Sequence, residues 1–453
     1  MSLARYKRPP LPPRVTPAVG FPGRVQRVRL RNGLDVILAP DSQSPTVSSW
    51  VWYHVGSVNE HPGITGVSHW VEHMMFQGSP HYRKGEIDRA IFAIGGTSNA
   101  FTDNDFTAYF ATVPKEHWDV PLRIEADRMV DARMDPTDSD RERVVILSER
   151  EGNENRPEFR VGEELHALAF RQHPYRWDPL GFAGDMARMP TSAVEDYYHR
   201  FYGPRNALLV LTGGFEAPTA LRQIRRRVGR ITGGGAATKV AETEPAIRGP
   251  RRGQLQGPGS TPLVEVGWPA PAFDDHRAAA VMLLDQLLGG ETSLFSPQPF
   301  WSRSTEHPNS RLYRRLVRTG LAVRASSDYR PRLYPGLFTI EAQAAPRIPI
   351  DHVEDAVRTE VRRLRQDGPT QAEWADARAI IARGARLAYE GSTRSGFRLG
   401  FFGVNGNLSR ERDLLRQVLH VSRAEARSEA ERLFPEESSV TVRYEPAGGT
   451  PSE

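Results

Sequence analysis

The chain of 453 residues repeats one order of elements on either side of residues 233–253. This segment, GGGAATKVAETEPAIRGPRRG, mixes Gly, Pro and Ala without the period of a helix or a strand, as expected for a linker. In each half, a strand ends in a Val-Gly pair, a helix follows, and a further strand closes the half. We therefore expect two copies of one domain, which also suits a chain too long for one ordinary core.

The first half opens with a hairpin signal. The segments VQRVRL and LDVILA read as strands, and the Asn32-Gly33 pair between them is typical of a tight hairpin turn. Helical segments follow near residues 84–94, 118–132 and 138–151. We therefore expect an α+β fold of two homologous domains, each a mainly antiparallel β-sheet with helices packed on it. The expected divisions are a flexible N-terminal arm (1–20), a first, metal-binding domain (21–232), a linker (233–253), a second domain (254–446) and a tail (447–453).

Composition excludes several kinds of site. The chain has no cysteine, which rules out disulfides, thiolate metal sites and a cysteine nucleophile. Its formal charge of +5 is a small excess of 60 Lys and Arg over 55 Asp and Glu, so we expect no nucleic-acid partner, although scattered arginines leave that as the weakest alternative. The sequence shows no secretion signal and no apolar run long enough to span a bilayer, so we expect a cytoplasmic protein without a membrane partner.

One helix of the first half holds a candidate metal site. In HWVEHMMF, His69 and His73 lie on one face of a helix expected from about Thr65 to Gly78. Their imidazoles can therefore bind one ion, while the carboxylate of Glu72 can reach the attacking water without binding the metal. Two ordinary helix histidines are the alternative. A catalytic zinc also needs a third protein ligand and an open position.

The corresponding helix of the second half lacks these residues. When the helices that follow HVGS and EVGW are aligned, the second copy has other residues at the three positions: Met282, Asp285 and Gln286. We therefore expect the second domain to be a degenerate copy without metal ligands, which supports the first.

The segments GITGVSHWVEHMMFQGS, GGTSNAFTDNDFTAYFATVP and RERVVILSERE resemble the pitrilysin/insulinase family of zinc peptidases, especially the zinc-bearing subunits of its mitochondrial-processing-peptidase-like branch. The resemblance implies a third metal ligand at Glu149, by its spacing from the second histidine. It thus implies one zinc ion per chain on His69, His73 and Glu149, with Glu72 as general base and general acid of a metalloendopeptidase.

Glu142 precedes Glu149 by two helical turns and so falls on nearly the same helix face. The family has an acidic residue at this position too. The resemblance implies that Glu142 orients a metal ligand or tunes the local field without binding the metal. A solvent-exposed glutamate is the alternative.

The segment from Thr97 to Phe101 is expected to be a strand that precedes a turn and a second strand. In the family, this edge strand receives an extended peptide, whose backbone pairs with it. The resemblance implies that Asn99 and Ala100 contact the substrate backbone and that Phe101 shapes a pocket. The substrates would be extended peptides or small unfolded proteins. A hairpin that only serves packing is the alternative.

The segments NSRLYRRLVRTGLAV and YPGLFTIEAQA extend the resemblance to the second half, with two departures. An insertion occupies residues 291–308, and the half lacks the family's Arg followed seven positions later by Tyr, which helps to hold the substrate carbonyl. The resemblance thus implies the zinc-bearing half of a heterodimer, with a homologous subunit that supplies the Arg/Tyr pair. The alternatives are a self-sufficient homodimer, in which Arg311 or Tyr313 replaces the pair, and a non-catalytic scaffold.

Overall fold

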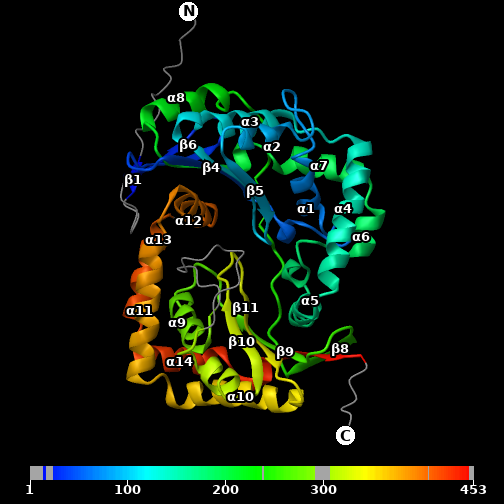
Figure 1. Ribbon diagram of the computed structural model, residues 1–453, viewed down its shortest axis with the longest axis vertical. Helices are drawn as coiled ribbons and strands as arrows, with labels where there is room; N and C mark the ends of the chain where they lie inside the picture. Colours follow the sequence, from blue (N-terminus) through cyan, green and yellow to red (C-terminus); the bar gives the residue numbers. More distant parts are fainter. Residues whose placement is uncertain (1–13, 17–23, 237–238, 291–306, 407, 448–453) are drawn as a thin grey trace, which may run out of the picture.

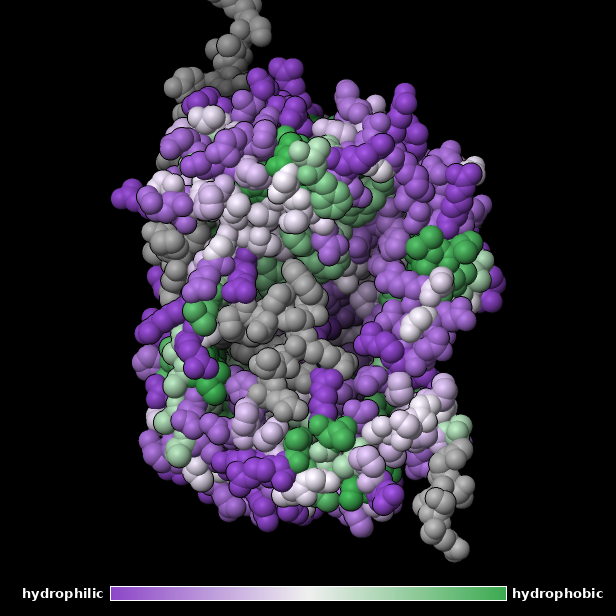
Figure 2. Space-filling model, viewed as in Figure 1, coloured by the Kyte–Doolittle hydropathy of each residue, from purple (hydrophilic) through white to green (hydrophobic). Residues whose placement is uncertain are grey.

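The computed structural model describes residues 14–16, 24–236, 239–290, 307–406 and 408–447. Its elements form two β-sheets, each covered by helices, and the two units lie one above the other in Figure 1. The first sheet draws all its strands from residues before the predicted linker, and the second from residues after residue 250. Most of the face shown in Figure 2 is hydrophilic, with apolar residues in separate patches.

The first sheet has seven strands and places β5 at one edge. Strands β3 and β7 are parallel, and the other neighbours are antiparallel. The β2–β3 hairpin turns at Asn32-Gly33, as predicted, since Gly33 has a φ of 101° and the side chain of Asn32 accepts a hydrogen bond from the Leu34 amide. In sheet order the strands are β1 (Arg14–Thr16), β2 (Val25–Arg29), β3 (Asp35–Pro40), β7 (Ala207–Gly213), β4 (Thr46–Tyr53), β6 (Thr107–Pro114) and β5 (Thr97–Thr102).

The second sheet repeats this topology without the first two strands. Its strands are, in order, β8 (Arg251–Gly257), β12 (Val440–Pro446), β9 (Leu263–Ala270), β11 (Gly336–Ala344) and β10 (Ala322–Tyr329). The pair β8 and β12 is parallel, and all other neighbours are antiparallel, as for β3, β7, β4, β6 and β5. The expected α+β fold with two homologous domains is therefore confirmed, and β10 is the counterpart of β5.

Helices cover both sheets. Those of the first half are α1 (Val67–Met74), α2 (Glu86–Phe92), α3 (Asp119–Asp131), α4 (Pro136–Glu154), α5 (Pro157–Ala169), α6 (Ala183–Arg188), α7 (Thr191–Phe201) and α8 (Ala217–Arg227). Those of the second are α9 (Ala278–Leu288), α10 (Ile350–Asp367), α11 (Gln371–Leu387), α12 (Ser392–Val404), α13 (Leu408–His420) and α14 (Arg423–Leu433). Helix α9 occupies the position after β9 that α1 occupies after β4.

The two halves exchange one helix each. Helix α5 packs on β8, β9 and β12 of the second sheet, and α12 packs on β4 and β7 of the first. Figure 1 shows α12 beneath the first sheet. The approach of α12 requires glycine, because a Cβ at Gly396 or Gly400 would collide with Trp50 or Trp52. Each sheet is thus completed by a helix from the other half, and the two units are joined by more than the linker.

The ends of the predicted segments differ in detail. Residues 14–16 of the predicted arm form β1, which pairs with β2; residues 1–13 and 17–20 lie outside the described residues. Strand β8 begins at Arg251, inside the predicted linker, because it pairs with β12. Most of the predicted insertion (291–306) and tail (448–453) also lies outside the described residues. Among the described helices, none combines the length and apolar character needed to cross a bilayer.

Candidate metal centre and active site

Helix α1 carries three of the predicted site residues. It is shorter than expected, because Gly66 adopts a left-handed conformation (φ 88°) immediately before its first residue. The buried carboxylate of Glu60 accepts hydrogen bonds from the amides of Gly66 (2.7 Å) and Ser68 (2.9 Å), which satisfies donors at the start of the helix. The loop before α1 therefore fixes where the helix starts and which way its histidines face.

Helix α4 brings the fourth residue to the same place. It begins after Asp135, whose side chain accepts hydrogen bonds from the amides of Thr137 and Asp138, with Pro136 as the first residue. The side-chain oxygen of Glu149 lies 3.7 Å from Nε2 of His69 and 3.6 Å from Nε2 of His73.

The three side chains form a compact set of possible ligands. The imidazole centroids of His69 and His73 are 4.6 Å apart, and one ligand atom from each of His69, His73 and Glu149 lies within 4.8 Å of the others. Among the described residues, no other set of three or more His, Cys, Asp or Glu side chains could hold a metal ion. Two imidazoles and a carboxylate are ligands that suit zinc, so the residues present fit the ion that the sequence predicts.

Glu142 lies behind this group and contacts one of its members. Its carboxylate is 3.3 Å from Nδ1 of His73 on one side and 3.4 Å from Nζ of Lys84 on the other. Only 8% of Glu142 is exposed, which excludes the alternative of a solvent-exposed glutamate. Sequence reasoning missed Lys84. Its only signal was its place at the start of a predicted helical segment.

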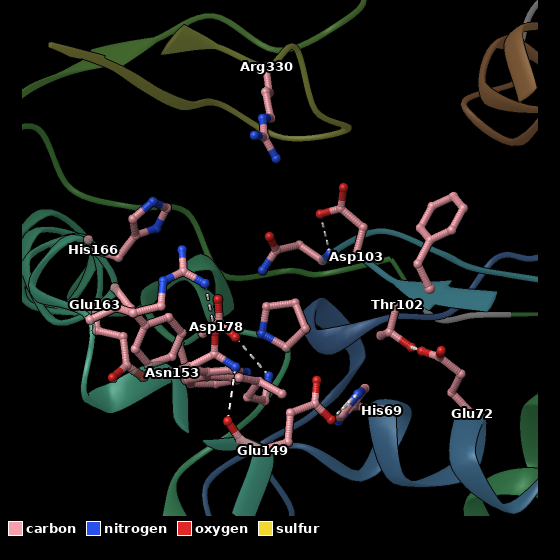
Figure 3. A pocket seen from close by; sticks show the side chains of 18 of the residues that line it. His69, Glu72, Thr102, Asp103, Glu149, Asn153, Glu163, His166, Asp178 and Arg330 are labelled. Atoms are coloured by element: carbon pink, nitrogen blue, oxygen red, sulfur yellow. Dashed lines mark hydrogen bonds and ion pairs between the residues drawn. The ribbon is translucent and has the colours of Figure 1, made fainter. Parts of the chain in front are cut away.

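Glu72 lines the same cavity as His69 and Glu149, and its side chain reaches strand β5. Its carboxylate accepts a 2.6 Å hydrogen bond from the hydroxyl of Thr102, the last residue of β5 (Figure 3). Sequence reasoning also missed Thr102, although it directly follows the predicted strand. Glu72, the candidate base, therefore links helix α1 to the edge strand β5.

Burial sets the protonation behaviour of these groups in the metal-free protein. Burial raises the pKa of Glu72 to about 7, against the hydrogen bond from Thr102, which lowers it. Burial and the neighbouring His73 lower the pKa of His69 to about 4. For His73, burial opposes the charged form, but contacts with Glu149, Glu72 and Glu142 outweigh it and raise the pKa. A carboxyl group with a pKa near neutrality can both accept and return a proton.

A cavity of about 580 Å³ opens in front of the site and is bounded by both halves. The first half contributes His69, Glu72 and Glu149, with residues 100–104, and the second contributes Arg330 and Arg332 from the β10–β11 loop. Figure 3 shows Arg330 pointing toward this space from above, opposite His69 and Glu149. Carboxylates and guanidinium groups thus face one polar, open cavity.

Strand β5 places the predicted peptide-contacting residues beside this cavity. Ala100 and Phe101 line it, while Asn99 is exposed on the strand and its side-chain oxygen accepts a hydrogen bond from the Ala100 amide. The ring of Phe101 packs edge-on against Trp50 and Trp52, at centroid distances of 6.4 and 5.9 Å. Phe101 therefore links the cavity wall to an aromatic cluster under the sheet.

Among the described residues of the second half, no side chains form a comparable group of possible metal ligands. Asp285 accepts a hydrogen bond from the Ser327 hydroxyl (2.7 Å), and the side-chain amide of Gln286 lies 3.1 Å from the His307 imidazole. Arg311 forms a 2.7 Å ion pair with Glu373, and it is absent from the described lining of the cavity. The counterpart of α1 is therefore held by local hydrogen bonds.

Comparisons with known proteins agree with this arrangement. A model of the insulinase family, peptidase family M16, matches residues 35–178, and a model of the peptidase M16 inactive domain matches residues 190–381. A zinc protease of Helicobacter pylori, PqqE, is 25% identical over 77% of this chain and 76% of its own length. A probable mitochondrial-processing peptidase subunit beta of Arabidopsis thaliana is 24% identical over 74% of this chain and 62% of its own length.

Solved structures share the fold. A protease from Helicobacter pylori matches 94% of this chain and 100% of its own chain with a TM-score of 0.87, at 24% sequence identity. The two family models follow each other in the order of the two halves, and the helix with His69, Glu72 and His73 lies within the first of them. The chain belongs to the insulinase family of peptidases, family M16.

Proposed function

We propose that this chain is a zinc-dependent endopeptidase subunit that hydrolyses peptide bonds in extended peptides or small unfolded proteins. The observation that carries the proposal is the convergence of His69, His73 and Glu149, with the carboxylate of Glu72 beside them and an edge strand next to it. A purely structural metal site has no need of a base beside its ligands. This arrangement therefore favours catalysis over the alternative of a scaffold.

The proposed mechanism assigns one role to each residue. His69, His73 and Glu149 would hold a zinc ion, which would supply a lowered pKa of bound water and polarisation of the scissile carbonyl. Glu72 accepts the proton of the attacking water and later returns it to the leaving amine. Thr102 holds the Glu72 carboxylate in place. Glu142 accepts a hydrogen bond from Nδ1–H of His73, which leaves Nε2, the nitrogen that faces Glu149, free to bind the metal.

The substrate would pair with the free edge of β5, which has only β6 as a neighbour among the described strands. Main-chain hydrogen bonds with an extended peptide require no particular side chains, so this mode suits many sequences. Asn99 and Ala100 would contact the peptide backbone, and Phe101 would form part of a side-chain pocket. The cavity in front of β5 is large enough for several residues of a peptide.

We further propose that the active form is a heterodimer. Two facts support this: the second half lacks the Arg/Tyr pair, and one relative is named as a subunit, the probable mitochondrial-processing peptidase subunit beta. A homodimer remains the alternative. Arg311 forms an ion pair with Glu373, which weighs against Arg311 replacing the Arg/Tyr pair as a hydrogen-bond donor to the substrate within the same chain.

Peptide cleavage read by mass spectrometry tests the proposal. The chain is stripped of metal with a chelator, reloaded with zinc, and assayed alone and after mixing with a homologous subunit that carries the Arg/Tyr pair. We expect cleavage only in the zinc-loaded mixture. Cleavage by the purified chain alone at the same rate would favour the homodimer, and stoichiometric zinc without cleavage in any mixture would favour the scaffold.

A further inference from the structure

The two repeat-related hairpins of this molecule meet at their tips. In the first half, residues 103–106 connect β5 to β6, and in the second half the counterpart loop, residues 330–335, connects β10 to β11. Both loops line the cavity in front of the metal-ligand group. The contact between them is therefore a contact of the second half with the substrate-binding hairpin of the first.

Arg332 lies at the centre of this contact. Its guanidinium group donates a 2.9 Å hydrogen bond to the carboxylate of Asp103 and a second, shorter one to the side-chain oxygen of Asn104. The guanidinium carbon also lies 5.4 Å from the centre of the Tyr175 ring. The side chain of Arg332 is only 19% exposed, so these charge-assisted hydrogen bonds are shielded from water.

A second residue of the same loop extends the contact. The amide of Leu333 donates a 3.0 Å hydrogen bond to the carboxylate of Asp105, which also accepts one of 2.6 Å from the hydroxyl of Tyr175. The Tyr175 hydroxyl in turn accepts from the amide of Tyr334. All three residues of the turn 103–105 are thus hydrogen-bonded to the loop of the second half, and Tyr175 adds an indirect link.

The same turn is bonded on its other side to the loop that leads into α1. The amide of Ser57 donates to the carbonyl of Asp103 (3.3 Å), and the amide of Val58 donates to the carbonyl of Asn104 (2.9 Å). Thr102, one residue before the turn, donates the 2.6 Å hydrogen bond to Glu72. The turn therefore connects the second half to the candidate base through a single peptide bond and one hydroxyl.

We propose that Arg332 is a positioning residue of the active site, which holds the turn 103–105 and, through Thr102, sets the position of the Glu72 carboxylate and of edge strand β5. This inference rests on the proposed function. It gives the second half, which holds no metal ligand, a specific task within the same chain. An error of about 1 Å in the position of a reacting group can cost about 100-fold in rate, so a loosened turn has a large effect on catalysis.

Three arginine variants test this role in the zinc-loaded, cleavage-competent preparation. Arg332→Met removes the charge, Arg332→Lys keeps the charge but not the fork of donors, and Arg251→Met is the matched control. Arg251 also joins the halves, through hydrogen bonds to the carbonyls of Leu168 and Ala169, but it lies outside the described lining of the cavity. We expect kcat/KM to fall about 10- to 100-fold in Arg332→Met and less in Arg332→Lys. Zinc content should be unchanged in all three.

Hydrogen exchange reports on the turn without any substrate. We expect the amides of residues 97–106 to exchange about tenfold faster in Arg332→Met than in wild type, while those of α4 keep their protection. Arg251→Met should leave both regions unchanged. If Arg332→Met does not fold, Arg332→Lys provides the same two readouts. Unchanged exchange in residues 97–106 would contradict the proposed contact.

A double-mutant cycle separates positioning from simple structural support. If Arg332 acts through Thr102, the Arg332→Met change costs less activity in a Thr102→Val background than in wild type. Equal fold changes in both backgrounds, or full activity of Arg332→Met, would overturn the positioning role of Arg332 but not the proposed function. Absence of cleavage by the wild-type protein in every mixture would instead overturn the proposed function.

Discussion

At the scale of single residues, the sequence indicated which side chains would group as candidate metal ligands but not which residues surround them. His69 and His73 follow from helical spacing, and Glu149 from the family resemblance; the structure brings all three together. Thr102 and Lys84 could not be found in this way, because their partners lie far away in the sequence. Thr102 contacts Glu72, and Lys84 contacts Glu142. Such contacts depend on how a strand and a loop pack against helices, which residue spacing does not encode.

The contact between Glu142 and His73 has a measurable consequence. Glu142→Gln replaces a charged acceptor with a neutral amide, so the imidazole becomes a weaker and less well-oriented ligand. We expect zinc affinity to fall about 10- to 100-fold, measured by competition with a chromophoric chelator. The control is Glu151→Gln, which changes an exposed glutamate of the same helix. Equal affinities of the two variants would contradict the role of Glu142.

At the scale of elements, strand and helix types were predicted well, because the apolar periods and the Asn32-Gly33 turn are local signals. Boundaries were less accurate. The helix expected from about Thr65 to Gly78 is α1, Val67–Met74, since the left-handed Gly66 and the capping by Glu60 fix its start. The exchange of α5 and α12 between the halves could not be predicted, because an apolar helix face does not specify which sheet it covers.

The close packing of α12 on the first sheet predicts a strong effect of one methyl group. In Gly400→Ala, the added Cβ would collide with the Trp52 ring, so we expect the free energy of unfolding to fall by about 1–3 kcal/mol. Gly152→Ala, in helix α4, meets no atom within 4 Å, and we expect it to be neutral or stabilising by about 0.5–1 kcal/mol. Denaturant titration of both variants tests the pair; equal stabilities would contradict the packing.

An ion-pair network joins three elements of the second half. The buried carboxylate of Glu354, in α10, pairs with Arg252 of β8, Arg358 of α10 and Arg443 of β12. Burial opposes the charge of Glu354, but the three arginines outweigh it and lower the pKa of this carboxyl group to about 2. A depressed pKa means that the charged form is favoured more in the folded than in the unfolded state.

This network makes stability depend on pH in the acidic range. The contribution of Glu354 should be fully present above its unfolded pKa of about 4.3 and should be lost as the pH falls toward about 2. We expect Glu354→Gln to be less stable than wild type by about 2–3 kcal/mol at pH 7, with a smaller difference at pH 3. Urea unfolding at the two pH values measures this. A difference that does not change with pH would contradict the assignment.

At the scale of the whole molecule, duplication explains how one chain can divide its tasks. The first copy carries the candidate metal ligands and the candidate base, while the second, matched by the model of an inactive domain, has other residues at the aligned positions and keeps the sheet topology. Its helix α12 completes the first sheet, and its β10–β11 loop bounds the cavity. The sequence predicted the duplication from its repeated order of elements, but the contact between the hairpin tips depends on the relative placement of the two copies.

In the proposed function, Glu72 acts as the base beside a zinc ion that His69, His73 and Glu149 would hold. The most direct test compares wild type with Glu72→Gln, both loaded with zinc, in the cleavage-competent mixture, by mass spectrometry of the peptide products and metal analysis of the same samples. We expect Glu72→Gln to keep its zinc and lose nearly all cleavage, by at least about 1000-fold. Cleavage by Glu72→Gln at the wild-type rate would contradict the proposed role of Glu72.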